Sequence, residues 1–209
     1  MLQQLDEKTF LTGCRFLEKR DPVFLTIVGQ FGYPRIWFRE PGFATLLHII
    51  LEQQVSLASA RATFQRLLDS VPSLTPANFL RFDEVGLKGI GFSRQKARYC
   101  QDLAGRIERG ELNLDQLTAL SDETVRTELM VVKGVGPWTA NIYLMIALRR
   151  PDVWPGSDLA LIQTIQELKA LKQRPTPAEA QQFAEAWKPW RSVATRLLWH
   201  YYLSPKTNR

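Results

Sequence analysis

The chain has 209 residues, of which 45% are hydrophobic and 11% aromatic, and its 27 Lys and Arg against 21 Asp and Glu give a formal net charge of +6. This composition excludes a disordered tail, and two cysteines exclude a disulfide framework and a four-thiolate zinc or iron–sulfur site. The basic balance favours an anionic partner, with nucleic acid as one option.

The N-terminal residues MLQQLDEKTFLTGC lack the basic start and unbroken apolar run of a signal peptide. The longest apolar stretches, LLHIIL and YLMIAL, are too short to cross a bilayer. We therefore expect a soluble, intracellular, monomeric protein without a membrane partner, cytoplasmic if the source is bacterial.

Apolar residues recur at helical spacing almost everywhere, and no segment alternates with period two, so the sequence predicts an all-α protein. The expected helices, in chain order, cover residues 5–20, 43–54, 57–71, 94–110, 121–132, 137–150, a segment from Asp158 through the 160s, and 176–203. Pro189 should kink or split the last of these helices. Linkers are short, and composition marks no domain boundary.

Two turns resemble each other: LKGIGFSRQKA at 87–97 and VKGVGPWTA at 132–140 both place Gly-x-Gly before a helix. Glycines let an anion approach the main chain, and a helix start directs N–H groups at it. Nucleotide-cofactor binding is disfavoured, because GxxxxGK[ST] and the third glycine of GxGxxG are absent. Such turns can merely end a helix, or they can hold the phosphates of duplex nucleic acid. The residues expected to contact the strand are Lys133, Gly134, Val135, Gly136 and Thr139 in one turn, and Lys88, Gly89, Gly91, Ser93, Arg94 and Lys96 in the other. A solvated basic helix face is the alternative for the second set.

The segment LMVVKGVGPWTANIYLMIAL, followed by the acidic residue in WPGSDLAL, resembles the helix-hairpin-helix (HhH-GPD) DNA glycosylase superfamily, and within it the 3-methyladenine DNA glycosylase II branch. ILEQQVSLASARA at 50–62, LKGIGFSRQKARYCQDLA at 87–104 and AWKPWRSVATRLLW at 186–199 support the resemblance. It implies an all-α helix-hairpin-helix glycosylase fold in which two helical subdomains, residues 1–40 with 145–209 and residues 41–144, flank an active-site cleft.

The resemblance implies base excision repair, in which a damaged nucleotide is flipped out of double-stranded DNA and its N-glycosidic bond is hydrolysed. Alkylated bases of the 3-methyladenine and 7-methylguanine type are the expected substrates. The family's catalytic acid follows the hairpin, where Asp158 stands, and Asp152 is the nearest competitor. A carboxylate there would stabilise positive charge on the sugar and activate water, although an Asp at a helix start is commonly only a cap. Lyase-type members carry a lysine where this chain has Trp138, so we predict a monofunctional enzyme that needs no cofactor.

Matching to the family places Trp138 and Trp199 in the substrate pocket, and Tyr143 is a third candidate because it lies on the same helix as Trp138. Such rings could attract a cationic alkylated base by about 0.5–2 kcal/mol. Ile142 and Leu159 replace tyrosines of some relatives, which leaves the preferred base open. The other large C-terminal aromatics are expected in the core: Trp187, Trp190, Tyr201 and Tyr202.

The QQVS segment at 53–56 resembles the family's intercalating loop, which fills the stack that the flipped base leaves. Gln53, Gln54 and Val55 are candidates, with Gln54 preferred, and a buried polar cap between helices is the alternative. Family hairpins often hold Na+ or K+ through main-chain carbonyls, which here are those of Met130, Val132 and Val135. Arg191 could support the active-site wall or form a structural ion pair.

Three other functions remain. A bifunctional glycosylase/lyase for oxidised bases is disfavoured by Trp138, and a non-catalytic DNA-binding hairpin module would not need Asp158 or an aromatic pocket. RNA binding through exposed aromatics lacks a recognisable RNA module.

Overall fold

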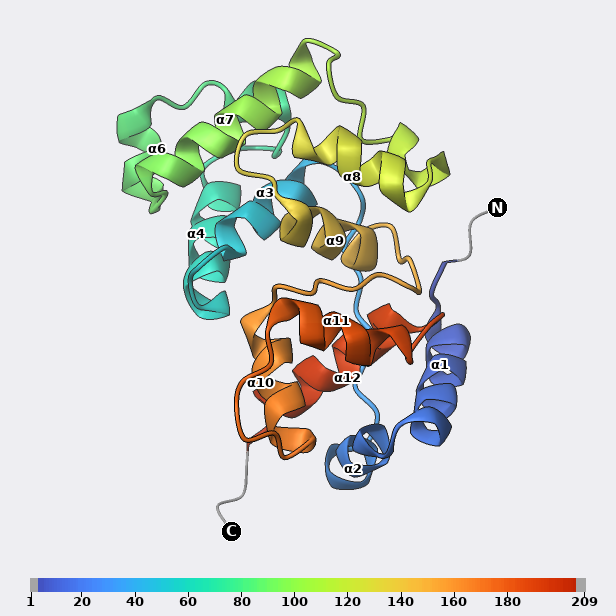
Figure 1. Cartoon of the computed structure of the whole chain (residues 1–209). Coiled ribbons are helices and arrows are strands. Elements are labelled where there is room, and N and C mark those ends of the chain that lie inside the picture. Colours follow the sequence, from blue (N-terminus) through green and yellow to red (C-terminus); the bar gives the residue numbers. More distant parts are fainter. Residues whose placement is uncertain (1–3, 206–209) are drawn as a thin grey trace. The chain divides into compact units, whose positions relative to one another are not determined.

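The computed structural model describes residues 4–205, and all regular secondary structure in that range is helical, which confirms the all-α prediction (Figure 1). The elements are α1 (Glu7–Arg20), α2 (Pro22–Phe31), α3 (Phe43–Glu52), α4 (Leu57–Asp69), α5 (Pro76–Phe79), α6 (Glu84–Ile90), α7 (Arg94–Glu108), the 3-10 helix η1 (Gln116–Ala119), α8 (Asp122–Met130), α9 (Pro137–Ile146), α10 (Leu159–Leu168), α11 (Pro177–Glu185) and α12 (Arg191–Leu203). Within residues 4–205, none of these helices combines the length and the apolar character needed to span a bilayer.

The chain divides into two units. The central unit is Arg39–Leu148 and contains α3 to α9, and the terminal unit combines the segments up to Phe38 and from Arg149 onward, with α1, α2 and α10 to α12. The sequence-based expectation placed these boundaries after residues 40 and 144. Each unit has its own buried side chains, so each is described by itself.

The terminal unit is built around Trp187, whose side chain is fully buried. Its ring meets Phe24 at 5.3 Å and Trp154 at 5.5 Å between centroids, both edge-on, as aromatic pairs prefer. The indole Nε1 donates to Asp21 Oδ2 at 3.0 Å, and Lys169 Nζ lies 2.8 Å from the same oxygen. Burial alone would raise the pKa of Asp21, but these hydrogen bonds and the Lys169 charge hold it below its usual value.

Helix α2 was not anticipated from the sequence. Asp21 caps its start by accepting a hydrogen bond from the Val23 N–H at 3.3 Å, and Pro22 occupies the first helical position. Gly32, with φ +71°, ends the helix. The Asp-Pro start and the glycine end are ordinary helix signals, and they were available in the sequence.

At the C-terminal end, α11 stops at Glu185 and α12 begins at Arg191, so Pro189 separates two helices, as expected. Of the aromatics expected in the core, Trp187 is fully buried, and Trp190 and Tyr201 are partly buried against the core of the terminal unit. Tyr202 is 40% exposed, so its assignment to the core was wrong.

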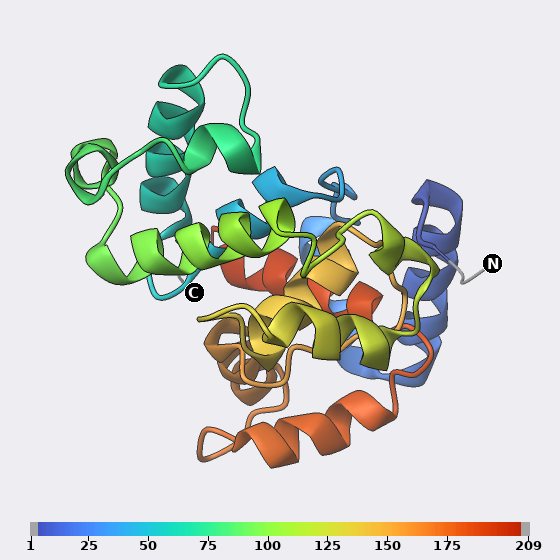
Figure 2. The same ribbon diagram turned by 90° about the horizontal axis from the view of Figure 1, so that it is seen from above.

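The central unit packs around α3, which contacts α4, α7 and α9. Most side chains of α3 are buried, which explains its nearly unbroken apolar sequence FATLLHIILE. Figure 2 shows α7 running across α3. The two glycine turns lie in two helix-turn-helix pairs, α6 with α7 and α8 with α9. Helix α3 packs against α7 of the first pair and α9 of the second.

Candidate functional site

The hairpin of α8 and α9 turns at residues 131–136. Gly134 has φ +83°, in the left-handed region that disfavours other residues, and a Cβ there would overlap the Tyr99 ring of α7. Gly136 precedes α9 and Pro137 opens it. Among the described residues, no side chain caps this start, and the positive end of the helix dipole lies at the turn. The backbone N–H groups at the start of α9 can therefore donate hydrogen bonds to an anion.

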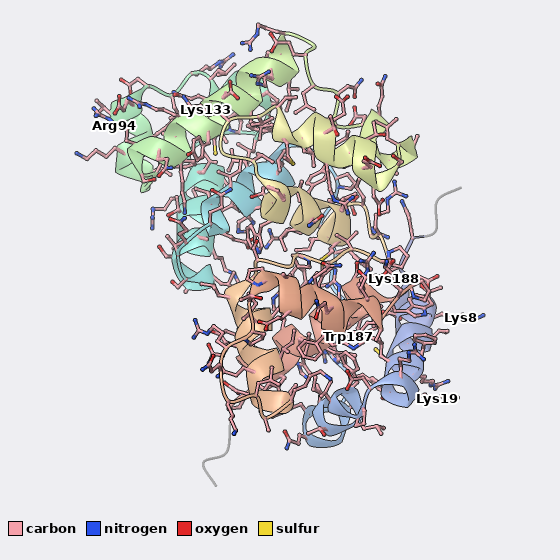
Figure 3. The ribbon with its side chains drawn as sticks, in the orientation of Figure 1. Lys8, Lys19, Arg94, Lys133, Trp187 and Lys188 are labelled. Carbon is pink, nitrogen blue, oxygen red and sulfur yellow. The ribbon has the colours of Figure 1, made fainter. Side chains whose placement is uncertain are left out.

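Helix α7 supports this turn from one side. Asp102 Oδ2 accepts a hydrogen bond from the Lys133 N–H at 2.8 Å and pairs with Arg106 Nε at 3.0 Å. Burial would raise the pKa of Asp102, but the bonds from Lys133 and Arg106 and the arginine charge lower it. Lys133, which is labelled in Figure 3, thus has its backbone N–H held by α7 while its side chain is exposed.

The loop between α3 and α4 supports the turn from the other side. Gln53 Nε2 donates to the Gly134 carbonyl at 3.0 Å and to Thr139 Oγ1 at 2.9 Å. Thr139 is buried, so it serves the structure of the hairpin and is not on a strand-binding surface, contrary to expectation. Gln54 and Val55 are exposed, and Gln54 has φ +56°. Of the three intercalation candidates, Gln53 is thus engaged within the protein.

The second glycine turn differs from the first. Gly89 lies inside α6, whereas Gly91 ends that helix with φ +109°. Ser93 caps α7 by accepting from the Lys96 N–H at 3.2 Å. Lys88 is exposed. Only Gly91 therefore makes the tight turn that the sequence assigned to both glycines.

Two basic residues of the second turn already have partners. Lys96 Nζ donates to the Leu51 carbonyl at 2.5 Å, and burial lowers the pKa of this lysine. Its assignment as a strand contact was therefore wrong, because its amine holds the last turn of α3. Arg94 forms an exposed ion pair with Glu84 at 2.5 Å. A surface pair of this kind is weak enough for a phosphate to displace, so the contact of Arg94 with a DNA strand stays a prediction.

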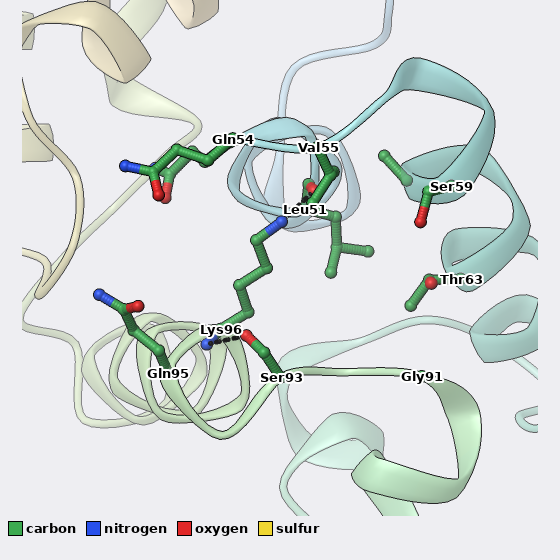
Figure 4. Close-up of a pocket in the computed structure, with 11 residues that line it drawn as sticks. Leu51, Gln54, Val55, Ser59, Thr63, Gly91, Ser93, Gln95 and Lys96 are labelled. Atoms are coloured by element: carbon green, nitrogen blue, oxygen red, sulfur yellow. Dashed lines mark hydrogen bonds between the residues drawn. The ribbon is translucent and has the colours of Figure 1, made fainter.

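A hollow of about 210 Å³ lies within the central unit, between the loop that joins α3 to α4 and the second glycine turn. In Figure 4, Gln54 and Val55 lie along one edge, Ser93 and Gln95 lie along the opposite edge, and Lys96 reaches between them to Leu51. The exposed loop residues thus stand at the rim of a concave, partly polar surface.

Asp158 is the N-cap of α10 in the terminal unit. Its Oδ1 accepts hydrogen bonds from the backbone N–H groups of Ala160 at 3.0 Å and Leu161 at 3.1 Å. Its own N–H donates to the Pro155 carbonyl at 2.9 Å, and the side chain is half-buried. The loop and the helix start together fix where this carboxylate lies.

Asp152 is held in a different way. Its Oδ1 accepts from Arg191 Nε at 2.8 Å and its Oδ2 from Nη2 at 2.9 Å, and the Arg191 N–H adds a bond of 3.2 Å to Oδ1. This bidentate pair occupies both carboxylate oxygens. Arg191 therefore makes the structural ion pair that was one of its two expected roles, and Asp152 is a poor candidate for chemistry.

The aromatic candidates have different environments. Trp138 is half-buried at the start of α9, and Trp199 is half-buried on α12 against the terminal-unit core. Tyr143 has no exposed surface, and its hydroxyl oxygen accepts from the Gly42 N–H at 2.8 Å. Burial raises the pKa of Tyr143 to about 12. Tyr143 is a core residue whose hydroxyl also holds the backbone of Gly42 before α3, so its assignment to the substrate pocket was wrong.

No cluster of three or more His, Cys, Asp and Glu side chains suited to a metal occurs in residues 4–205. Cys14 and Cys100 are both buried, one in each unit, and burial raises the pKa of both thiols. At the hairpin, the Val132 carbonyl accepts from the Val135 N–H at 3.0 Å. Met130 ends α8, where the last carbonyls of a helix lack intrahelical donors, and a monovalent cation at this turn stays a prediction.

The family described as "HhH-GPD superfamily base excision DNA repair protein" matches residues 47–190, which is more than half of the chain and spans the hairpin, Asp158 and Asp152. The chain belongs to this family. Its fold is accordingly the helix-hairpin-helix glycosylase fold of the HhH-GPD superfamily, as the resemblance implied.

Among curated HhH-GPD relatives, a Bacillus subtilis (strain 168) protein named "DNA-3-methyladenine glycosylase" is 28% identical over 201 residues, 90% of this chain and 66% of that protein. "DNA-3-methyladenine glycosylase 2" of Escherichia coli (strain K12) is 30% identical over 189 residues, 83% of this chain and 64% of that protein. The chain thus spans just under two thirds of the length of these two relatives. A solved structure of a Schizosaccharomyces pombe 3-methyladenine DNA glycosylase in complex with abasic DNA has a TM-score of 0.82 at 24% identity, covering 90% of this chain and 95% of that chain, and supports the fold.

Two residues that hold the hairpin, Tyr99 and Asp102, were missed from the sequence. They stand three residues apart on α7 and therefore share one face of that helix. The segment LKGIGFSRQKARYCQDLA contains both, so a search for the side of α7 that faces the neighbouring turn could have found them.

Proposed function

We propose that this HhH-GPD protein is a monofunctional DNA glycosylase that acts as a monomer on double-stranded DNA and excises alkylated bases of the 3-methyladenine and 7-methylguanine type. The observation that carries the proposal is the place of the Asp158 carboxylate, which two backbone N–H groups hold at the start of α10, after the hairpin. The other acidic candidate, Asp152, is committed to Arg191. The names of the relatives point to the same substrate class.

The hairpin is proposed to bind the DNA backbone. The α9 start supplies main-chain donors, Gly136 leaves room for a phosphate, and exposed Lys133 adds a positive charge. These contacts would carry no sequence information, which suits an enzyme that must act wherever damage occurs. Lys88, Gly91 and Arg94 are proposed to make weaker contacts of the same kind.

Asp158 is proposed to stabilise the transition state of base release. As the bond between C1′ and the base nitrogen breaks, its electron pair leaves with the base and positive charge develops on the sugar. The Asp158 carboxylate would lower the energy of that charge and orient a water molecule. The water oxygen then bonds to C1′ and its proton passes to the carboxylate, which leaves an abasic site.

The chain has Trp138 at the position where lyase-type members carry a lysine. This favours hydrolysis over lyase chemistry, because an indole cannot form a Schiff base. Trp138 and Trp199 are proposed to line the base pocket, where their rings would attract a cationic alkylated base. With Tyr143 in the core, the proposed pocket is less aromatic than the sequence suggested. We further propose that the reaction needs no cofactor, and that the carbonyls of Met130, Val132 and Val135 can hold Na+ or K+ as a structural ion.

The decisive experiment is a glycosylase assay on duplexes that carry 3-methyladenine, 7-methylguanine, 1-methyladenine, hypoxanthine or uracil. We expect the wild-type protein to release an alkylated base without cutting the strand and without borohydride trapping. Asp158→Asn should be slower by a factor of about 10²–10³, the usual effect of removing a group that stabilises transition-state charge.

Asparagine is a matched replacement, because its side-chain oxygen can cap α10 as aspartate does. DNA binding and folding of Asp158→Asn should therefore stay close to wild type, so that only the charge is tested. Equal release by both proteins would remove Asp158 from the mechanism. Strand cleavage with a trapped covalent adduct would favour the bifunctional alternative, and DNA binding without any base release would favour a non-catalytic hairpin module.

A further inference from the structure

Gln53 connects two segments of the central unit that are far apart in sequence. Both hydrogens of its amide nitrogen have acceptors in the hairpin, the Gly134 carbonyl at 3.0 Å and Thr139 Oγ1 at 2.9 Å. Gly134 lies in the turn and Thr139 in the first turn of α9, so one side chain bridges the turn and the helix start.

The backbone around Gln53 is also constrained. Gln53 is the C-cap of α3, and its N–H donates a hydrogen bond to the Ile50 carbonyl at 3.3 Å. Ser56 is the N-cap of α4. Only Gln54 and Val55 lie between these caps, and Gln54 adopts φ +56°. A left-handed conformation in a residue other than glycine costs about 1–2 kcal/mol and persists only where the surroundings fix it.

We propose that Gln53 is a positioning residue that couples the 53–55 loop to the hairpin turn, so that Gln54 and Val55 are presented to DNA in register with a strand bound at the hairpin. The inference rests on the proposed function, because it gives these two segments their DNA-binding roles. Gln53 itself would not enter the duplex. Breaking its bonds to reach DNA would leave the buried Thr139 hydroxyl and the Gly134 carbonyl without this donor.

The physical basis is the short connection that Gln53 makes between the hairpin turn and the 53–55 loop. Gln53 and Gln54 are adjacent, so anchoring the first fixes where the chain reversal at the second takes place. A hairpin displaced by a bound phosphate would pull the loop with it through the amide, and a loop inserted in the base stack would in turn hold the hairpin. Removal of the amide should make the two segments respond independently.

A double-mutant cycle tests this coupling. Affinity is measured for a duplex with a tetrahydrofuran abasic-site analogue, using Lys133→Ala at the hairpin, Gln54→Ala in the loop, and both together. With Gln53 present, the combined effect should differ from the product of the single effects by about threefold or more, as for other coupled residues. In a Gln53→Met background, the combined effect should equal the product.

Gln53→Glu adds a pH readout that loss of packing alone would not produce. The carboxylate is nearly isosteric with the amide but cannot donate at pH 8, so the Gly134 carbonyl loses its donor and the coupling should fall. As the pH falls through the ordinary glutamate pKa of about 4.3, the side chain regains one donor and part of the coupling should return, whereas the Gln53→Met protein should show no such recovery.

Amide hydrogen exchange provides a test without DNA. Exchange at residues 133–136 should be faster in Gln53→Met than in wild type. It should be unchanged in Gln65→Met, a control for an exposed glutamine whose amide bonds only to Asp69 within its own helix.

The outcomes separate the inference from the proposed function. Additive effects with Gln53 present, or unchanged exchange at the hairpin in Gln53→Met, would overturn the coupling even if base excision and its loss in Asp158→Asn are as proposed. Failure to excise any base would count against the proposed function, while the exchange experiment would still decide whether Gln53 positions the hairpin.

Discussion

Substitution by alanine should destabilise the hairpin at Gly134 and leave its stability nearly unchanged at Gly136. In Gly134→Ala, the left-handed backbone costs about 1–2 kcal/mol, and the new Cβ overlaps the Tyr99 ring, an overpacking worth typically 1–3 kcal/mol. The free energy of unfolding of the central unit should therefore fall by about 2–5 kcal/mol. In Gly136→Ala, the backbone has φ −103° and nothing lies within 4 Å of the new Cβ, so stability should change little.

Denaturant unfolding measures the stability of both variants, and affinity for undamaged duplex measures the hairpin's function. Gly136→Ala should fold normally yet bind DNA more weakly, because its methyl group would stand where a phosphate approaches the α9 start. In a Tyr99→Ala background, Gly134→Ala should lose the part of its cost that comes from overlap and keep about 1–2 kcal/mol from the backbone. A neutral Gly134→Ala, or the same cost with and without the Tyr99 ring, would refute the reasoning.

Three further predictions concern the terminal unit. Asp158→Ala should unfold more easily than Asp158→Asn by about 0.5–2 kcal/mol in denaturant titrations, because alanine cannot cap α10; equal stability would mean that the cap contributes nothing. The lowered pKa of Asp21 means that its contribution to stability is complete above the ordinary carboxyl pKa of about 4 and is lost as the pH falls through the folded-state value, since protonation weakens the bond with Lys169. Unfolding followed from pH 6 to pH 3 should show this loss in wild type and a smaller one in Asp21→Asn. Arg191→Lys should destabilise the unit measurably in thermal unfolding, because lysine cannot form the bidentate pair with Asp152, and an unchanged midpoint would contradict that.

Helical periodicity predicted most of the helices because the spacing of apolar residues records which face is buried. It missed α2, α5 and α6, and at α2 the capping signals at Asp21 and Pro22 were present but were not read. Periodicity also gave α9 too much length, since the helix ends at Ile146 and not at residue 150. Helix ends depend on where the chain must turn to reach the next contact, which a local pattern does not record.

The errors at the site have a common cause, because the partner of each misassigned side chain is distant in sequence. Tyr143 stands five residues after Trp138 on α9, and at about 100° per residue the two side chains point in clearly different directions. One of them can therefore reach the core while the other lies near the helix surface. Lys96 finds its acceptor at Leu51, 45 residues away, which no inspection of the local charge pattern could reveal.

Asp158 was recognised through its place after the hairpin, although residues of its type at a helix start are usually caps. The structure shows that it is a cap, and this does not argue against a catalytic role. Two backbone N–H groups fix one carboxylate oxygen, so the position of the carboxylate is set before a sugar cation develops beside it. A flexible carboxylate would have to be ordered during the reaction. The cap provides this order beforehand, so in Asp158 the structural role is a means to the proposed catalytic one.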